Sequence, residues 1–204
     1  MDLPENSFVF CCFNSNYKIS PHEYDIWMRL LHRVKESVLW ITGSNQWSIK
    51  NLKKEAQLRG INPSRIIIAK KVPMEDHLRR HQLADLFLDT FIYNAHTTAS
   101  EALWAGLPIV TKIGCSYNAR AVSSMLKAIG LDELISNTAK DYERKIFELA
   151  SNPNYLQKIK LMLNKNRLTK PLFDTKRYTK HLEQAFEKTY EIYYQGKEPI
   201  SFYL

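Results

Sequence analysis

The chain has 204 residues, of which 45% are hydrophobic, and its formal net charge is +8. This composition predicts a globular protein with a real core and excludes global disorder. The positive charge suits an anionic partner, whether a nucleotide, a nucleic acid or a membrane, and does not choose among them.

Three cysteines, Cys11, Cys12 and Cys115, have the spacing of neither a disulfide framework nor a zinc site, which indicates a reducing compartment. The first ten residues, MDLPENSFVF, lack the basic and apolar regions of a secretion signal. No uninterrupted apolar run approaches the roughly 20 residues of a membrane span. We therefore expect a soluble, cytoplasmic protein without a membrane partner.

Short apolar runs alternate with amphipathic segments along the first two thirds of the chain. Five runs are expected to be strands, at residues 8–13, 37–41, 65–69, 83–88 and 108–111. Helices are expected from Ser20-Pro21 onward and at about 48–59, 73–81, 98–105 and 119–129. Because the strands are apolar on both faces, the pattern predicts an α/β fold with a doubly wound, mostly parallel, Rossmann-like sheet and helices on both faces.

Only helical periodicity is visible from Asp141 onward, which predicts a C-terminal helical extension. We expect a Rossmann-like domain over residues 1–135 and C-terminal helices over residues 136–204.

The segment DTFIYNAHTTASEALWAG, residues 89–106, combines the end of a buried strand, a polar loop and the start of a helix capped by hydroxyls. Such a junction presents unpaired backbone N–H groups and the positive end of a helix dipole, which together bind phosphate. In doubly wound sheets, ligands bind outside the carboxyl ends of the strands. This segment is therefore the first candidate for a functional site.

Lys18 follows the turn after the first strand, so its ammonium could reach a phosphate at this edge, although an exposed loop lysine is the simpler interpretation. Thr97 and Thr98 could donate to a diphosphate or only cap the helix. Glu101 lies one turn later on their face, where it could accept a ribose hydroxyl or only complement the helix dipole.

His77 and His81 have the i, i+4 spacing of metal ligands, but Arg79 and Arg80 intervene and no third ligand is evident, so we expect no metal. His77 could instead stack on a nucleotide base, although an exposed histidine is the simpler interpretation. The chain lacks GxSxG, P-loop and GxGxxG motifs, which leaves hydrolase, NTPase and dinucleotide-oxidoreductase functions without support.

Six blocks, taken together and in order, resemble a known family: FNSNYKI, SVLWI, RIII, EDHLRRHQLADLFLDT, NAHTTASEALWAGLPIVT and PLFDTKRYT. They resemble the carboxyl-terminal catalytic half of the O-linked N-acetylglucosamine transferases, including the SPINDLY-type fucosyltransferases, over roughly residues 8–194. The resemblance implies a B-type glycosyltransferase architecture (GT-B), in which two Rossmann-like halves face each other. The half resembled here binds the nucleotide-sugar donor.

The resemblance also implies roles for individual residues. Lys18 would contact the donor diphosphate and stabilise the leaving nucleotide, which makes it the catalytic residue of this half. His96, Thr97 and Thr98 would form the diphosphate loop. Glu101 would bind the ribose hydroxyls, and His77 would stack near the base with Arg80 close by. Three positions depart from the family pattern: Glu101 replaces the usual Asp, Ser15 a common Gln, and Met74 a Lys near the ribose.

The function implied is an inverting transfer of a sugar, GlcNAc from UDP-GlcNAc, to Ser or Thr hydroxyls of a protein, without a cofactor or metal. The family's amino-terminal half and tetratricopeptide repeats, which would contact the protein acceptor, lie outside these 204 residues. The chain would thus be a fragment or one half of a split enzyme, able to bind UDP or a UDP-sugar but inactive alone. Alternatives are an O-fucosyltransferase using GDP-fucose and a non-catalytic nucleotide-sugar binding module.

Nucleic-acid binding lacks any motif. Aromatic residues are dense in the last helix and tail, and the resemblance implies that this helix packs on the family's amino-terminal half. Without that half, we expect either self-association through residues 178–203 or an exposed, protease-sensitive segment. The alternative is that the helix packs on its own sheet as part of the core.

Overall fold

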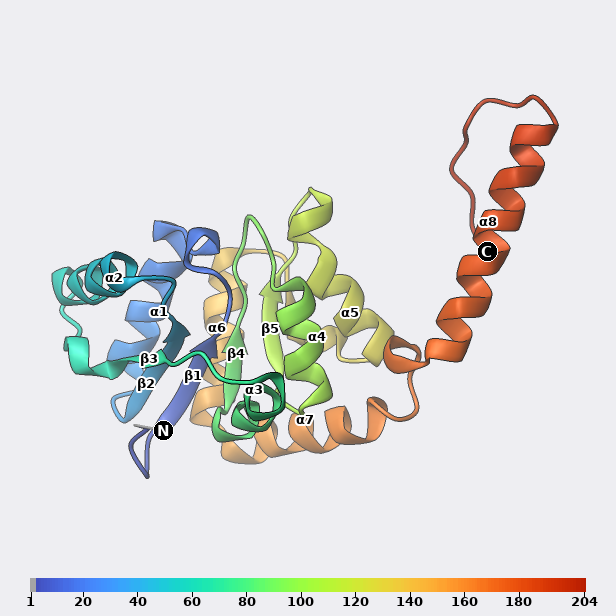
Figure 1. Cartoon of the computed structure of the whole chain (residues 1–204). Coiled ribbons are helices and arrows are strands. Elements are labelled where there is room, and N and C mark those ends of the chain that lie inside the picture. Colours follow the sequence, from blue (N-terminus) through green and yellow to red (C-terminus); the bar gives the residue numbers. More distant parts are fainter. Residues whose placement is uncertain (1–2) are drawn as a thin grey trace.

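The computed structural model describes residues 3–204 and contains one six-stranded, entirely parallel sheet. The strand order is β3-β2-β1-β4-β5-β6 (Figure 1). The strands are β1 Phe8–Cys12, β2 Ser37–Thr42, β3 Ile66–Ala69, β4 Leu86–Leu88, β5 Ile109–Lys112 and β6 Ile135–Ser136. The predicted fold class is confirmed. The predicted count of five strands was wrong, because β6 has only two residues and no apolar run marks it.

The strands are buried on both faces, as their continuous apolar sequences predict. Cys11 and Cys12 lie in the centre of this core as free thiols. Burial raises the pKa of both thiols, so they stay protonated and pack as small apolar side chains.

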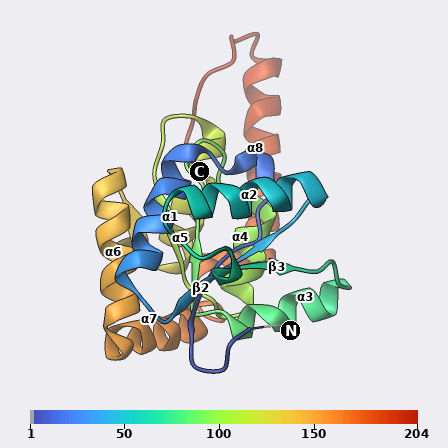
Figure 2. The same ribbon diagram turned by 90° about the vertical axis from the view of Figure 1, so that its left-hand side faces the viewer.

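Helices cover both faces of the sheet (Figure 2). They are α1 Pro21–Arg33, α2 Gln46–Leu58, α3 Met74–Arg80, α4 His96–Trp104, α5 Ala121–Ile129, α6 Ala139–Ser151, α7 Pro153–Asn166 and α8 Thr175–Tyr194. Helix α1 begins as predicted, with Ser20 as N-cap and Pro21 in the first helical position. The Ser20 amide donates to Glu23 Oε1 at 2.9 Å, which completes a capping box.

Helix α6 packs against α1 and β5, so the C-terminal region contributes to the core. Its Tyr142 is fully buried, accepts a hydrogen bond from Trp27 Nε1 at 3.1 Å and donates to the carbonyl of Asp89 at 2.9 Å. One phenol thereby joins α1, α6 and the carboxyl end of β4.

Helix α8 buries no residue and rises away from the rest of the molecule, with the C-terminal tail folding back beside it (Figure 1). Its aromatic residues are exposed, as the composition of this segment predicted; they are Tyr178, Phe186, Tyr190, Tyr193 and Tyr194. No helix within residues 3–204 is both long and apolar enough to cross a bilayer.

Candidate functional site

The carboxyl ends of β1 and β4 meet at the centre of the sheet, where the strand order changes direction. Lys18, in a 3₁₀ turn after β1, reaches across to the loop between β4 and α4. Its Nζ donates to the carbonyl of Asn94 at 3.0 Å and lies 4.0 Å from the centre of the Tyr93 ring. Partial burial lowers the pKa of Lys18, and the negative charge of Asp89 opposes this shift. The ammonium of Lys18 therefore makes defined contacts within the fold, unlike that of a lysine exposed on the surface.

Three polar side chains fix the shape of the loop from β4 to α4. Asn14 Nδ2 donates to Thr90 Oγ1 at 2.8 Å, and Thr90 Oγ1 donates to the carbonyl of Tyr93 at 2.5 Å. Asn94 Nδ2 donates to the carbonyl of Thr90 at 2.7 Å. All three side chains are buried. The loop is therefore held from both sides before any ligand binds.

Asp89, which sequence reasoning did not select, anchors the base of this loop. Its Oδ1 accepts the amides of Thr90 at 2.9 Å and Ala95 at 2.8 Å, and its Oδ2 accepts Thr111 Oγ1 at 2.6 Å. Burial raises the pKa of Asp89 from 3.8 to about 7, although the three hydrogen bonds and Lys18 oppose the shift. The sequence feature that could have identified Asp89 is an acidic residue directly after a buried apolar strand, because a buried carboxyl group is rare unless it has hydrogen-bond partners.

The start of α4 corrects the prediction that threonine hydroxyls cap this helix. The helix begins at His96, its N-cap is Ala95, and no side chain caps it. Thr97 and Thr98 lie inside the first turn. The physical reason is that Asp89 accepts a hydrogen bond from the amide of Ala95. This bond fixes the start of the helix before the two threonines.

This arrangement leaves free donors at the helix start. Among residues 3–204, no protein acceptor pairs with the backbone amides of Thr97 and Thr98. Unpaired first-turn amides and the positive end of the helix dipole favour an anion there. With the ammonium of Lys18 held at the same edge of the sheet, the geometry suits a charged phosphate ligand.

His96 is braced within the same loop cluster. Its Nε2 lies 3.2 Å from the carbonyl oxygen of Asn118, which belongs to the loop after β5. Its ring centre lies 4.9 Å from that of Tyr93 and 5.9 Å from that of Tyr117. Three strand ends therefore contribute to one cluster.

Glu101 and His77, 24 residues apart in sequence, meet beside this cluster. His77 Nε2 lies 3.2 Å from Glu101 Oε2. Burial and the charge of Arg80 lower the pKa of His77, while Glu101 raises it. The two side chains predicted to contact the base and the ribose are thus brought together, with both of them only partly exposed.

Arg80 and His81 lie deeper behind His77. Arg80 donates to the carbonyl of Lys70 at 2.7 Å, and its guanidinium lies 4.5 Å from the centre of the Phe13 ring. His81 Nδ1 donates to the carbonyl of His77 at 2.7 Å, and burial lowers the pKa of His81 from 6.5 to about 4. No cluster of three or more candidate metal ligands occurs within residues 3–204.

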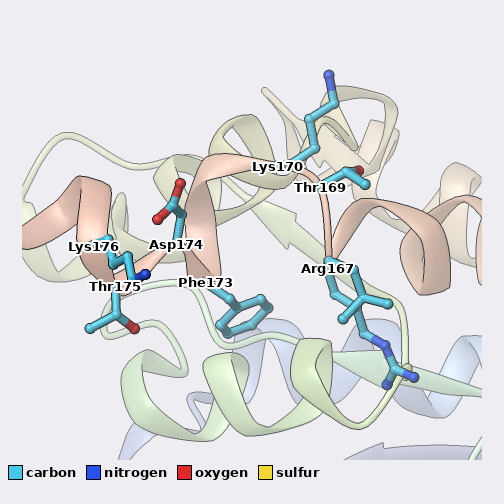
Figure 3. A pocket seen from close by; sticks show the side chains of 8 residues that line it. Arg167, Thr169, Lys170, Phe173, Asp174, Thr175 and Lys176 are labelled. Carbon is cyan, nitrogen blue, oxygen red and sulfur yellow. The ribbon is translucent and has the colours of Figure 1, made fainter.

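A separate hollow of about 290 Å³ lies at the elbow between α7 and α8 (Figure 3). Its Phe173 packs on Trp104 at 5.1 Å, and Arg167 donates to the carbonyl of Trp104 at 2.6 Å. Trp104 is the last residue of α4. The hollow is therefore at the opposite end of α4 from the unpaired amides and is not part of this site.

The chain is similar to a known protein family and to known proteins. The model of glycosyl transferase family 41 matches residues 1–182. The chain is 37% identical over 201 residues to a probable UDP-N-acetylglucosamine–peptide N-acetylglucosaminyltransferase, SEC, of Arabidopsis thaliana, covering 98% of this chain and 21% of the plant protein. It is 34% identical over 194 residues to the UDP-N-acetylglucosamine–peptide N-acetylglucosaminyltransferase of Caenorhabditis elegans, covering 95% of this chain and 17% of the worm protein.

A solved structure is similar in fold and sequence. It is a K341M mutant of the Thermobaculum terrenum O-GlcNAc transferase, which superposes with a TM-score of 0.84 at 28% identity. The match covers 91% of this chain and 38% of the bacterial chain. The chain thus spans about a fifth of the length of the two curated relatives. On the match over residues 1–182 and these identities, it belongs to glycosyl transferase family 41.

Proposed function

We propose that this chain is the donor-binding half of a protein O-glycosyltransferase that moves GlcNAc from UDP-GlcNAc to Ser or Thr hydroxyls. One observation carries the proposal: the ammonium of Lys18 and the backbone amides of Thr97 and Thr98, which have no acceptor within residues 3–204, lie at the same edge of the sheet. The plant and worm relatives, both named as UDP-N-acetylglucosamine–peptide N-acetylglucosaminyltransferases, support this choice of donor and acceptor class.

The chemical role of this half is to stabilise a leaving group. In an inverting transfer, an acceptor hydroxyl attacks the anomeric carbon and the bond to the diphosphate breaks, so negative charge grows on the departing UDP. Lys18 and the N-terminus of α4 would offset that charge, and their positions are already set by the loop. The proposal requires no metal, because these groups supply the positive charge.

The remaining donor contacts are proposed from the family resemblance, and the observed geometry is compatible with them. Glu101 would accept hydrogen bonds from the ribose hydroxyls, and its bond to His77 would hold the carboxylate in place. His77 would lie beside the base, with Arg80 behind it. His96 would complete the diphosphate loop with Thr97 and Thr98.

The protein acceptor would be contacted by parts of the full-length family protein that precede this region, so the chain alone is proposed to bind donor without transferring sugar. We place the protein in the cytoplasm. We also propose that the exposed aromatic residues between 178 and 203 mediate association, either with those parts or between copies.

Calorimetric titration tests the proposal. The chain is titrated separately with UDP-GlcNAc, UDP, GDP-fucose and GDP. Binding of the two uridine compounds in preference to the guanosine compounds is expected, and the reverse order would assign the fucosyltransferase alternative. Lys18→Ala should weaken UDP binding, because it removes the ammonium proposed to contact the diphosphate. The matched control, Lys71→Ala, removes an equal charge from an exposed lysine after β3 and should bind UDP like the parent.

Transfer is tested separately, with the preceding family region supplied as a second chain. Sugar transfer to a Ser- or Thr-containing peptide is expected from the mixture and not from this chain alone. Donor binding without transfer by the mixture would instead assign a binding module.

A further inference from the structure

The ring of Tyr93 lies between two of the side chains proposed to contact the diphosphate. The ammonium of Lys18 is 4.0 Å from the ring centre, a distance at which the negative face of an aromatic ring attracts a cation. The imidazole of His96 is 4.9 Å from the same ring centre, with an angle of 31° between the ring planes. One side chain therefore contacts both a cation after β1 and the first residue of α4.

The backbone at Tyr93 is held independently of its ring. Its carbonyl accepts the Thr90 hydroxyl at 2.5 Å, and the carbonyl of Thr90 in turn accepts Asn94 Nδ2 at 2.7 Å. The ring itself is only half-buried. Replacing the ring should therefore leave the loop in its present shape and change only what the ring contacts.

The ammonium of Lys18 has few contacts that could fix its position. A lysine side chain has four flexible carbons, and ordering it costs conformational entropy. Within residues 3–204, its ammonium has one hydrogen-bond acceptor, the carbonyl of Asn94. A single acceptor allows the ammonium to pivot about it, whereas the Tyr93 ring gives a second contact that fixes its direction. The remaining N–H donors then stay available for a ligand.

We propose that Tyr93 is a positioning residue for nucleoside diphosphate binding, holding the Lys18 ammonium and the His96 ring at the N-terminus of α4. The inference rests on the proposed function, because it names the residue that sets the geometry of the same site. Tyr93 acts through Lys18 and His96 and needs no direct contact with the nucleotide.

The test uses three variants of the full chain: Tyr93→Phe, Tyr93→Leu and the control Tyr17→Leu. Tyr17 is 80% exposed and adjacent to Lys18 in sequence, but it has no aromatic or cation contact within residues 3–204. UDP affinity is measured by calorimetry, and the order parameter of Lys18 Nζ is measured by NMR without ligand. Thermal unfolding checks that each variant folds, and Tyr93→Met replaces Tyr93→Leu if the latter does not.

Tyr93→Phe keeps the ring and should bind UDP within about two-fold of the parent, as should Tyr17→Leu. Tyr93→Leu should bind UDP about five-fold more weakly, the loss expected for a partly exposed cation–π contact. Only Tyr93→Leu should lower the order parameter of Lys18. An unchanged affinity or order parameter in Tyr93→Leu, or equal losses in Tyr17→Leu, would overturn the inference.

The two proposals fail separately. A parent chain that binds no UDP would overturn the proposed function, and the ligand-free order parameter would still decide whether Tyr93 holds Lys18. A parent chain that binds UDP, with Tyr93→Leu equal to it, would overturn only the role of Tyr93.

Discussion

Asp89→Asn is expected to change how the stability of this protein depends on pH. Oδ1 accepts the amides of Thr90 and Ala95, and Oδ2 accepts Thr111 Oγ1. When Asp89 is protonated on Oδ2, the last bond would reverse, with the acid donating to the threonine oxygen. Asparagine has the same shape and the same donor and acceptor at these positions. The variant therefore reproduces the protonated state of Asp89 permanently.

The sign follows from the raised pKa. Asp89 has a pKa of about 7 in the folded protein against 3.8 for the ordinary group, so the folded state holds its proton more tightly. Its contribution to stability is complete below the unfolded pKa and is lost as the pH rises through the folded pKa. Between about pH 5 and pH 8, this single group should lower the free energy of unfolding by roughly 2–3 kcal/mol. For a chain of this length that corresponds to roughly 5–10 °C in melting temperature.

The assay is urea unfolding of parent and variant across this pH range, with the difference between the two proteins as the result. Other titrating groups, including His81 with its lowered pKa, cancel in that difference. The two proteins should be similarly stable only below about pH 4, and the advantage of the variant should grow by roughly 2–3 kcal/mol between pH 5 and pH 8. A variant less stable than the parent by the same amount at every pH would refute the reasoning, because it would mean that the buried carboxylate is ionised throughout.

Three other changes probe the core, the ribose contact and the C-terminal helix. Tyr142→Phe should lower the free energy of unfolding, measured in urea, by roughly 2–4 kcal/mol. It removes the hydrogen bond to the Asp89 carbonyl and leaves Trp27 Nε1 buried without an acceptor. Unchanged stability would contradict this. Glu101→Asp should keep or improve UDP affinity in calorimetry, and Glu101→Ala should lose roughly 1.5–3 kcal/mol of it; two variants equal to the parent would remove the ribose role. Ending the chain at residue 174 should preserve the melting temperature and UDP binding, because α8 buries no residue. It should also abolish any self-association seen by light scattering. Loss of folding would show that α8 belongs to the domain.

The fold could be predicted because buried parallel strands leave continuous apolar runs in the sequence. All five predicted strands are present within a few residues, whereas β6, with Ile135 and Ser136 alone, is too short to leave a pattern. The placement of Lys18 against the loop that precedes α4 was also predictable, since the carboxyl ends of parallel strands share one edge of the sheet.

The details of the site depend on loop conformation, which the sequence pattern does not encode. The preference of hydroxyls for helix caps predicted the wrong start for α4, because the bond from Ala95 to Asp89 overrides it. The pairing of His77 with Glu101 and the contact of Tyr93 with Lys18 join segments far apart in sequence. Such contacts follow from how three loops fold together, and no local spacing marks them.

The central claim, that a diphosphate binds at the start of α4, is tested most directly by NMR of the ¹⁵N-labelled chain titrated with UDP and, separately, with uridine. UDP should strongly shift the backbone amides of Thr97 and Thr98, because these amides have no acceptor within residues 3–204. UDP should also shift the Nζ resonance of Lys18, because this ammonium lies at the same edge of the sheet. Uridine, which has no phosphate, should leave them near their free positions while shifting residues around His77. Equal shifts at Thr97 and Thr98 with both ligands, or none with UDP, would contradict the claim.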